Sequence, residues 1–209
     1  SVASDAMKEG IYFEYLCTGG LPRNGIAPEP ERLKSGALTT PYQRATDAAQ
    51  LFKKIIQHYK IKILKVGYVL SDDEKNGILD ILAEWDGQKV IIDLKYSGLI
   101  DDKWNEMGWD LESLHMKDSL MIQGVHYKLL AEKCLNIHDI PFFYFVFDSK
   151  DPNNVKIIRQ EVDESKMQSH VVALNNIKGK LSYDAFTPLP SMQKCSKCPL
   201  ATKCKYKVD

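Results

Sequence analysis

The sequence has no net charge, because 28 Lys and Arg residues balance 28 Asp and Glu residues in a chain of 209. No global field therefore draws it to nucleic acid or anionic membrane, and a polyanion would need a local basic patch. The chain also lacks an apolar run near the roughly 18 residues of a membrane-spanning helix, and it does not open with a secretory signal. We therefore expect an intracellular, cytoplasmic protein with no membrane partner.

Repeats, low-complexity tracts and the phosphate-loop pattern G-x-x-x-x-G-K-[ST] are all missing. Without that loop the chain has no helicase motif, so any strand unwinding would need a partner. The length fits one sizeable domain or at most two small ones, and we take residues 1–209 as one domain. We divide it into N-terminal helices and a crossing loop (1–60), a sheet core (61–162) and a C-terminal helix with a tail (163–209).

Disulfide pairing is not expected, because five cysteines are an odd number and a reducing compartment keeps them as thiols. Three of them, Cys195, Cys198 and Cys204, fall in the stretch "CSKCPLATKC" near the end of the chain. This clustering indicates metal ligation. The C-x2-C spacing serves zinc and iron–sulfur clusters equally well.

The hydrophobic pattern predicts helices and strands in mixed order. Helices are expected over 2–16, 46–60, 117–134 and 163–179, and strands over 61–71, within 77–98, and over 141–148 and 155–162. An irregular loop rich in Gly and Pro is expected over 19–41. The order predicts an α/β fold with a mixed central sheet flanked by helices and a cysteine-rich tail.

Two acidic residues interrupt the apolar runs of "GILDILAEWDGQKVIIDLKYSG", residues 77–98. Asp86-Gly87 is a strong signal for a two-residue hairpin turn. That turn places Asp80 opposite Asp93, with Cβ atoms about 4.5–5.5 Å apart. Two carboxylates so placed repel each other unless a cation lies between them. A hard divalent ion such as Mg²⁺ or Mn²⁺ would turn this pair into a site.

Lys95 lies two residues beyond Asp93 and therefore on the same face of its strand. The opposite face is apolar and is expected to be the core side: Leu79, Ile81, Ala83, Trp85, Val90, Ile92 and Leu94. The acidic face would then open toward polar surroundings, and a solvated Asp–Lys pair is the structural alternative. The carbonyl of Leu94 is within reach as a further oxygen ligand. This set fits metal-dependent phosphodiester cleavage, with Lys95 orienting the nucleophile or neutralising charge.

These residues resemble the signature of the PD-(D/E)XK nuclease superfamily, with Asp80 in "GILD" and Asp93 and Lys95 in "DLK". Gln123 and Tyr127 match the QxxxY element of its RecB-like exonuclease branch, and their spacing places them on one face of a helix. The resemblance implies a restriction-endonuclease-like sheet with all five residues at the catalytic site.

Many relatives in this superfamily carry an upstream His or Glu that adds to the metal site. In this sequence Gly67 stands roughly where such an acid is expected. Glu14 or Asp47 could supply the missing ligand, and a solvated helix position is the alternative for each.

The C-x2-C-x5-C tail together with Cys17 resembles the iron–sulfur members of the RecB-like branch, including CRISPR-associated and AddB-type exonucleases, and leaves open a bacterial or phage-encoded protein. The resemblance implies that Cys17, Cys195, Cys198 and Cys204 hold a [4Fe–4S] cluster through four thiolates. A four-cysteine zinc site is the alternative. Cys134 is expected to be a buried apolar thiol.

The expected function is a Mg²⁺- or Mn²⁺-dependent DNA exonuclease acting on single-stranded ends in recombination, repair or phage DNA metabolism, with a helicase or recombination partner. Tail lysines would track the phosphate backbone, or form a solubilising face: Lys194, Lys197, Lys203, Lys205 and Lys207. Trp104 and Trp109 could stack on bases or pack in the core.

Two other functions remain open. A non-catalytic nucleic-acid-binding or assembly subunit could retain the nuclease fold, although the presence of Asp80, Asp93 and Lys95 favours catalysis. A zinc-ribbon redox or transcription accessory protein would leave the hairpin acids unexplained.

Overall fold

The structure, a computed structural model, describes residues 3–22, 25–73, 75–102, 108–110, 118–161, 164–182, 192–196 and 201–204. Contacts divide the chain into two compact units, Ser1–Met167 and Gln168–Asp209. The assignment of residues 1–209 to one domain stays a prediction.

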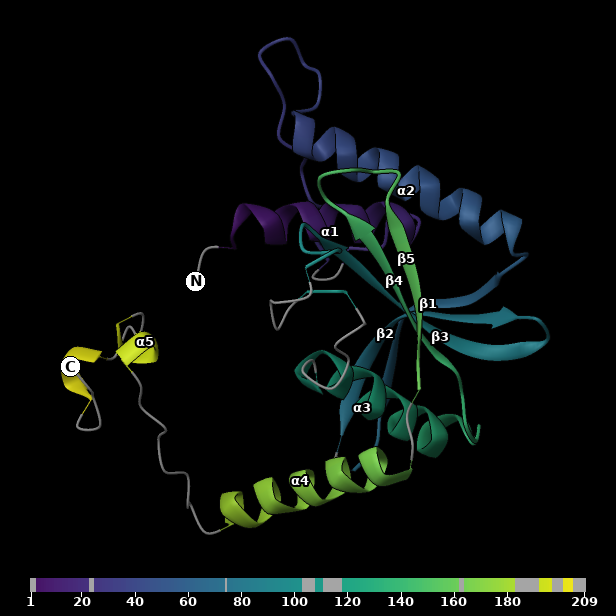
Figure 1. The fold of residues 1–209 in the computed structure, drawn as a ribbon, viewed down its shortest axis with the longest axis vertical. Coiled ribbons are helices and arrows are strands. Elements are labelled where there is room, and N and C mark those ends of the chain that lie inside the picture. Colours follow the sequence, from purple (N-terminus) through teal and green to yellow (C-terminus); the bar gives the residue numbers. More distant parts are fainter. Residues whose placement is uncertain are drawn as a thin grey trace. The chain divides into compact units, whose positions relative to one another are not determined.

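A mixed sheet of five strands, formed by the described residues, is the centre of the first unit (Figure 1). Its strands lie in chain order: β1 (Lys62–Ser71), β2 (Asn76–Trp85), β3 (Gln88–Ser97), β4 (Phe142–Asp148) and β5 (Val155–Gln160). β3 and β4 are parallel, and the other neighbouring pairs are antiparallel. The predicted α/β fold with a mixed sheet flanked by helices is confirmed.

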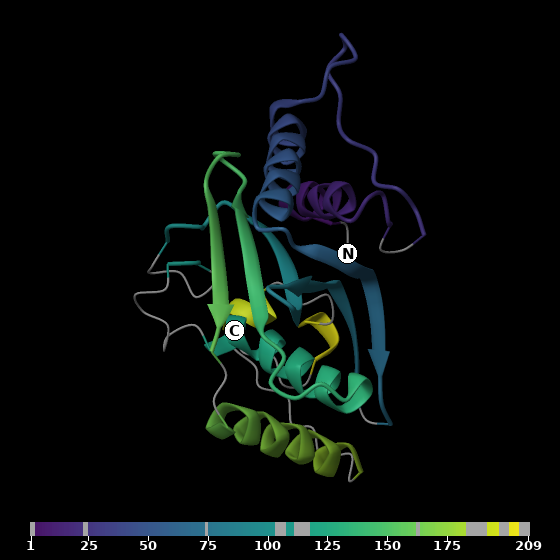
Figure 2. The same cartoon turned by 90° about the vertical axis from the view of Figure 1, so that its right-hand side faces the viewer.

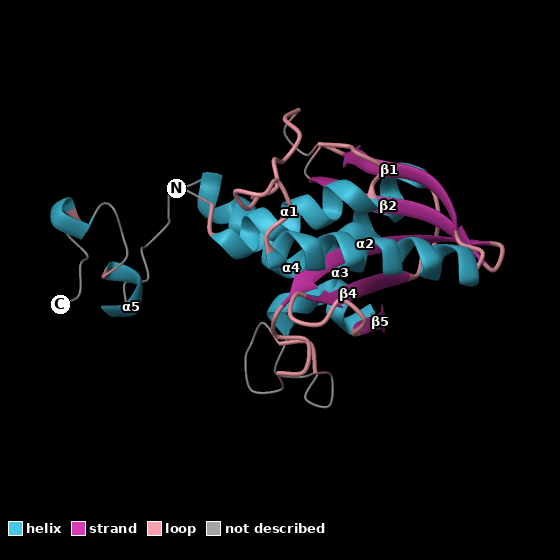
Figure 3. Cartoon of the chain, turned by 90° about the horizontal axis from the view of Figure 1, so that it is seen from above, coloured by secondary structure: helices cyan, strands magenta, loops and turns pink. Residues whose placement is uncertain are grey.

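Helices bury both faces of this sheet. α1 (Asp5–Cys17) and α2 (Thr40–His58) pack together on one face, where Phe13, Phe52 and Phe147 belong to the first core cluster (Figure 3). α3 (Asp118–Leu135) packs on the other face, where Leu130 and Tyr144 belong to the second cluster (Figure 2). Two buried faces explain why the strands are apolar on both sides over most of their length.

Local signals set the beginnings of the first two helices. Ser4 caps α1, because its side chain accepts a hydrogen bond from the Met7 N–H at 3.3 Å. α2 begins at Thr40 rather than at residue 46, because Pro41 occupies its first turn. The missing N–H of proline has no intrahelical partner there in any case. The crossing loop is therefore slightly shorter than predicted.

The β2–β3 hairpin has the predicted turn. Asp86 and Gly87 have φ angles of 50° and 78°, the left-handed values that a type I′ turn requires. The ladder runs from Trp85 opposite Gln88 and ends one step before Asp80 and Asp93, with Ile81 opposite Ile92.

Leu79 does not share a face with Ile81, which corrects the predicted alternation. Ile81 packs in the first cluster, whereas Leu79 packs in the second. The change occurs at Asp80, which the register with β1 places opposite Gly67. Gly67 has a φ of 55°, and this conformation breaks the alternation of β1 at the same level.

The second unit contains most of α4 (Glu164–Ser182), together with α5 (Met192–Cys195) and the short helix η2 (Ala201–Lys203). None of the helices in the described ranges is both long enough and apolar enough to cross a membrane.

Candidate active site at the end of the β2–β3 ladder

Asp80 joins β2 to β3 through its side chain. In a continued antiparallel ladder the Leu94 N–H would bond the main chain of Leu79. Instead it donates to Oδ2 of Asp80 at 2.8 Å. Asp80 is 5% exposed as a residue, and its carboxylate is fixed between the two strands where regular pairing stops.

Asp93, Lys95 and Gln123 form one group of polar contacts. Lys95 makes an ion pair with Oδ2 of Asp93 and donates from Nζ to Oε1 of Gln123 at 3.0 Å. Gln123 in turn donates from Nε2 to Oδ1 of Asp93 at 2.9 Å. The structure thus brings the D-x-K segment of β3 together with the glutamine of QxxxY on α3.

The acidic face of the hairpin is not an open polar surface, which corrects the sequence interpretation. Leu82 and Ile91 lie in the second core cluster, because α3 packs on this face. Asp93 itself is 1% exposed, whereas the Lys95 side chain is 29% exposed. Solvent therefore reaches the site at Lys95 rather than across the face of the sheet.

An open groove of about 950 Å³ lies on the α1 side of the sheet and includes Leu94 and Lys95 in its lining. Glu14, the proposed upstream metal ligand, lines the same groove. Asp47 lies on α2, where Gln43 donates to its carboxylate at 2.9 Å.

Tyr127 packs against the beginning of β2. A Cβ atom on Gly77 would lie 2.6 Å from its ring, so the absence of a side chain at Gly77 admits the tyrosine. The ring centroids of Tyr127 and Phe142 are 6.2 Å apart. These contacts show how Tyr127 seats α3 on the sheet, and its predicted catalytic role stays a prediction.

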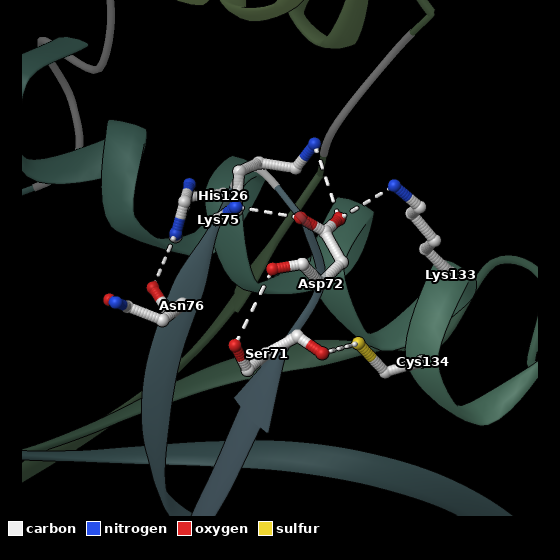
Figure 4. Close-up of polar contacts among 7 residues, drawn as sticks. All are labelled: Ser71, Asp72, Lys75, Asn76, His126, Lys133 and Cys134. Atoms are coloured by element: carbon white, nitrogen blue, oxygen red, sulfur yellow. Dashed lines mark hydrogen bonds and ion pairs between the residues drawn. The ribbon is translucent and has the colours of Figure 1, made fainter.

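Three side chains of α3 hold the helix against the turn between β1 and β2 (Figure 4). The contacts are His126 Nε2 to the carbonyl of Asn76 at 3.1 Å, Lys133 Nζ to the carboxylate of Asp72 at 3.2 Å, and Cys134 Sγ to the carbonyl of Ser71 at 3.5 Å. They position the helix that carries Gln123. Cys134 is only half-buried, which corrects the expectation of a buried thiol.

Tyr144 is a neighbour of the site that sequence reasoning missed. It lies beside Asp93 in the parallel β3–β4 register, and the Lys95 Nζ is 5.8 Å from the centre of its ring. Burial, and then the charge of Asp93, raise the pKa of Tyr144 well above its usual value. No local pattern gives the strand pairing that places it there.

The missing upstream acid has a steric explanation. Gly67 adopts a left-handed φ, and a Cβ atom there would lie 2.5 Å from Cδ2 of Leu21. The backbone opposite Asp80 therefore disfavours an acidic side chain at this position.

The donor set fits a hard divalent cation held by few protein ligands. Within the described residues, no group of three or more His, Cys, Asp and Glu side chains is placed to hold a metal ion. Asp80 and Asp93 remain, with the carbonyl of Leu94, which points toward β2 as its N–H does. Mg²⁺ commonly binds through one or two carboxylates and completes its shell with water and substrate phosphate.

The predicted cluster cysteines are divided between the units. Cys17 is 5% exposed in the first core cluster, and burial raises the pKa of its thiol well above the usual value. Cys195 and Cys204 are half-buried thiols of the second unit, and Cys198 lies outside the described residues. The iron–sulfur site stays a prediction.

The structure describes the side chains of only a few of the residues that are predicted to bind nucleic acid. Lys203 is exposed on η2. The side chain of Lys194, and Lys197, Lys205, Lys207 and Trp104 as a whole, lie outside the description. Trp109 is 3% exposed, with its ring centre 5.0 Å from that of Tyr144, so the core-packing alternative is confirmed for it.

Among solved structures, a protein from Eubacterium rectale that is provisionally named an exonuclease has a similar fold. The TM-score is 0.68 at 17% identity, over 100% of this chain and 77% of that one. A second structure, SSO0001, matches with a TM-score of 0.36 at 13% identity, over 78% of this chain and 68% of that one. No protein-family model matches the sequence. No curated protein matches it either. At such identity the first likeness establishes the fold, and the RecB-like branch stays a prediction.

Proposed function

We propose that this protein is a Mg²⁺- or Mn²⁺-dependent nuclease that hydrolyses phosphodiester bonds of DNA at Asp80, Asp93 and Lys95. The observation that carries the proposal is the ion pair between the buried Asp93 and the partly exposed Lys95, which Gln123 contacts at both partners, near the Asp80 carboxylate. Asp is rarely buried unless it is paired, and such clusters are frequent at functional sites. The similar fold of a protein provisionally named an exonuclease supports the same conclusion.

Each residue has a distinct role in this proposal. Asp80 and Asp93 would hold the cation together with the Leu94 carbonyl. When bound, the cation supplies Lewis-acid polarisation of a phosphoryl oxygen and lowers the pKa of a water ligand. Lys95 is partly exposed beside the groove, where its ammonium can orient the attacking water or neutralise charge on the phosphate. Gln123 holds the Asp93 carboxylate and the Lys95 ammonium in place through its two hydrogen bonds, before substrate binds.

The substrate class and setting belong to the same proposal. We infer exonuclease action on single-stranded DNA ends in recombination, repair or phage DNA metabolism in the cytoplasm. Unwinding would come from a helicase partner. We further propose that the four cysteines Cys17, Cys195, Cys198 and Cys204 hold a [4Fe–4S] cluster, on the strength of their number and spacing.

The direct test is degradation of end-labelled single-stranded DNA with Mg²⁺, with Mn²⁺ and with EDTA. We expect metal-dependent shortening by the parent and a loss of about 10²-fold or more in Lys95→Met. Lys89→Met is the matched control, because Lys89 is exposed nearer the hairpin turn of the same strand. A parent that binds DNA but does not cleave it with either metal would instead support the non-catalytic subunit.

A further inference from the structure

The groove beside Lys95 is built from three segments of the first unit. α1 forms one wall, residues 26–29 form a second, and β3 contributes Leu94, Lys95 and Tyr96. The α1 residues recur at helical spacing on one side of the helix: Ala6, Met7, Gly10, Ile11, Phe13 and Glu14. The volume of the groove, about 950 Å³, lies in the range of small-molecule binding sites.

The lining is mostly apolar and carries little positive charge. Its charged lining residues are Glu14, Glu29 and Lys95, so acids outnumber the single cation, whose ammonium also pairs with Asp93 and donates to Gln123. Such a surface repels a phosphate backbone along most of its length and attracts phosphate only near Lys95. Ile26 and Met7 are 80% and 59% exposed, although large apolar side chains usually gain from burial.

Gly10 keeps the groove open. It lies in the middle of α1, where glycine is less favourable than alanine. Its φ is not left-handed, and among the described residues no atom beyond its own stretch of helix lies within 4 Å of the position that a Cβ atom would occupy. Neither backbone conformation nor helix packing therefore requires glycine there, whereas any side chain would enter the groove.

We propose that this groove receives an unpaired nucleobase of the substrate strand, adjacent to the phosphate that Lys95 contacts. The proposal deepens the nuclease function and rests on it for the identity of the ligand. Every base has an apolar π-face that packs on such walls, and a base inside a duplex does not expose it. The groove thus selects single strands by their bases, while the phosphate contact is made at Lys95.

The test measures binding of short fluorescent oligodeoxythymidylates in EDTA, where cleavage cannot interfere. A second set carries one abasic residue at each position in turn, with the same number of phosphates. We expect one abasic position to weaken binding by the parent about tenfold, as loss of one base-stacking contact does. We expect Gly10→Phe to bind the full strand as weakly as the abasic strand, with no further loss on removing the base.

Gly179→Phe is the matched control. Gly179 is a glycine of α4 that does not line the groove, and within the described part of the chain no atom outside its own helix turn lies within 4 Å of its Cβ position. This variant should keep the parent's preference for the base-bearing strand. Ile26→Ser, at a well-exposed position, should weaken that preference without affecting the thermal unfolding midpoint.

The outcomes separate this inference from the nuclease assignment. Three results would overturn the groove proposal even if the protein cleaves DNA. The parent could bind full and abasic strands equally, or bind neither. Alternatively, Gly10→Phe could keep the parent's preference for the base-bearing strand. A base preference that Gly10→Phe removes, in a parent that never cleaves, would support the groove and overturn the nuclease.

Discussion

Gln123 donates a hydrogen bond to Asp93 across 2.9 Å and thereby joins α3 to the buried carboxylate of β3. The same side-chain amide accepts from Lys95 at 3.0 Å. A side-chain amide carries its donor and its acceptor on separate atoms, so it can donate to a carboxylate and accept from an ammonium at once. The glutamine of QxxxY thus has a chemical reason to be glutamine.

Replacing Gln123 should therefore lower activity while leaving the protein folded. Gln123→Leu removes both hydrogen bonds, and Gln123→Glu keeps an acceptor for Lys95 but places a second carboxylate against Asp93. We expect losses of about 10- to 100-fold, typical for residues that orient metal ligands. The measurement is the rate of DNA degradation over a Mg²⁺ titration. Gln50→Leu, at an exposed position of α2, is the control. Parent-like rates and metal dependence in both Gln123 variants would contradict the role.

The neighbouring Gly124 allows α3 to approach the sheet. A Cβ atom at this position would lie 1.8 Å from Oε1 of Gln160 and 3.0 Å from the Phe142 ring. Gln160 is buried, so it has little room to move. We expect Gly124→Ala to lower the free energy of unfolding by about 1–3 kcal/mol through overpacking, despite its better helix propensity. Urea denaturation measures this change.

Gly179→Ala is the control for Gly124→Ala. The described residues place no atom outside the local helix within 4 Å of the Gly179 Cβ position, so alanine should raise stability there by about 0.5–1 kcal/mol. Stabilisation of similar size by both alanines would show that the close approach of α3 to β4 and β5 carries no energetic cost.

The sequence alone was sufficient to predict local structure that is decided by residues adjacent along the chain. Asp86-Gly87 predicted the hairpin turn, because the backbone preference of these two residues decides the local conformation.

The sequence was insufficient where a contact distant in sequence decides. The Leu94 N–H bonds the Asp80 side chain where the ladder ends, and Leu79 packs on the unexpected face at the level where Gly67 breaks the alternation of β1. Tyr144 reaches Asp93 only because β3 and β4 pair in parallel. The alternation of apolar and polar residues along a strand predicts neither the Leu94–Asp80 bond nor the β3–β4 pairing, because both are tertiary contacts.

Gly67 provides a third prediction, because its backbone conformation opposes any side chain there. Its φ of 55° strains non-glycine residues, whereas the nearest atom to the Cβ position, Cδ2 of Leu21 at 2.5 Å, belongs to an exposed side chain that can move away at little cost. Gly67→Ala should therefore lower the free energy of unfolding by about 1–2 kcal/mol. Gly87→Ala, with a φ of 78°, should cost a similar amount. A loss at Gly67 well below the loss at Gly87 would contradict this explanation.

Tyr144 should make stability depend on alkaline pH. Burial raises its pKa in the folded protein, whereas the unfolded tyrosine ionises near its usual value of about 10. Its contribution is therefore complete below about pH 10 and is lost as the pH rises above that value, by up to about 1.4 kcal/mol per pH unit. Urea denaturation between pH 8 and 11 should show a steeper fall for the parent than for Tyr144→Phe. Tyr59→Phe, at an exposed tyrosine, controls for removal of a phenol.

Cys17 offers the sharpest test of the cysteine site, because its surroundings favour a neutral thiol. It is packed in the first core cluster, and burial raises the pKa of the thiol that a metal would need as thiolate. If Cys17 is nonetheless a cluster ligand, Cys17→Ala should lose iron and the broad absorbance near about 400 nm after anaerobic purification, and should also lose stability. Cys134→Ser, outside the predicted set, should keep both. Iron retained in Cys17→Ala would remove Cys17 from the ligand set, since its packing alone then explains its burial. Colourless parent protein with stoichiometric zinc would replace the cluster by the zinc alternative.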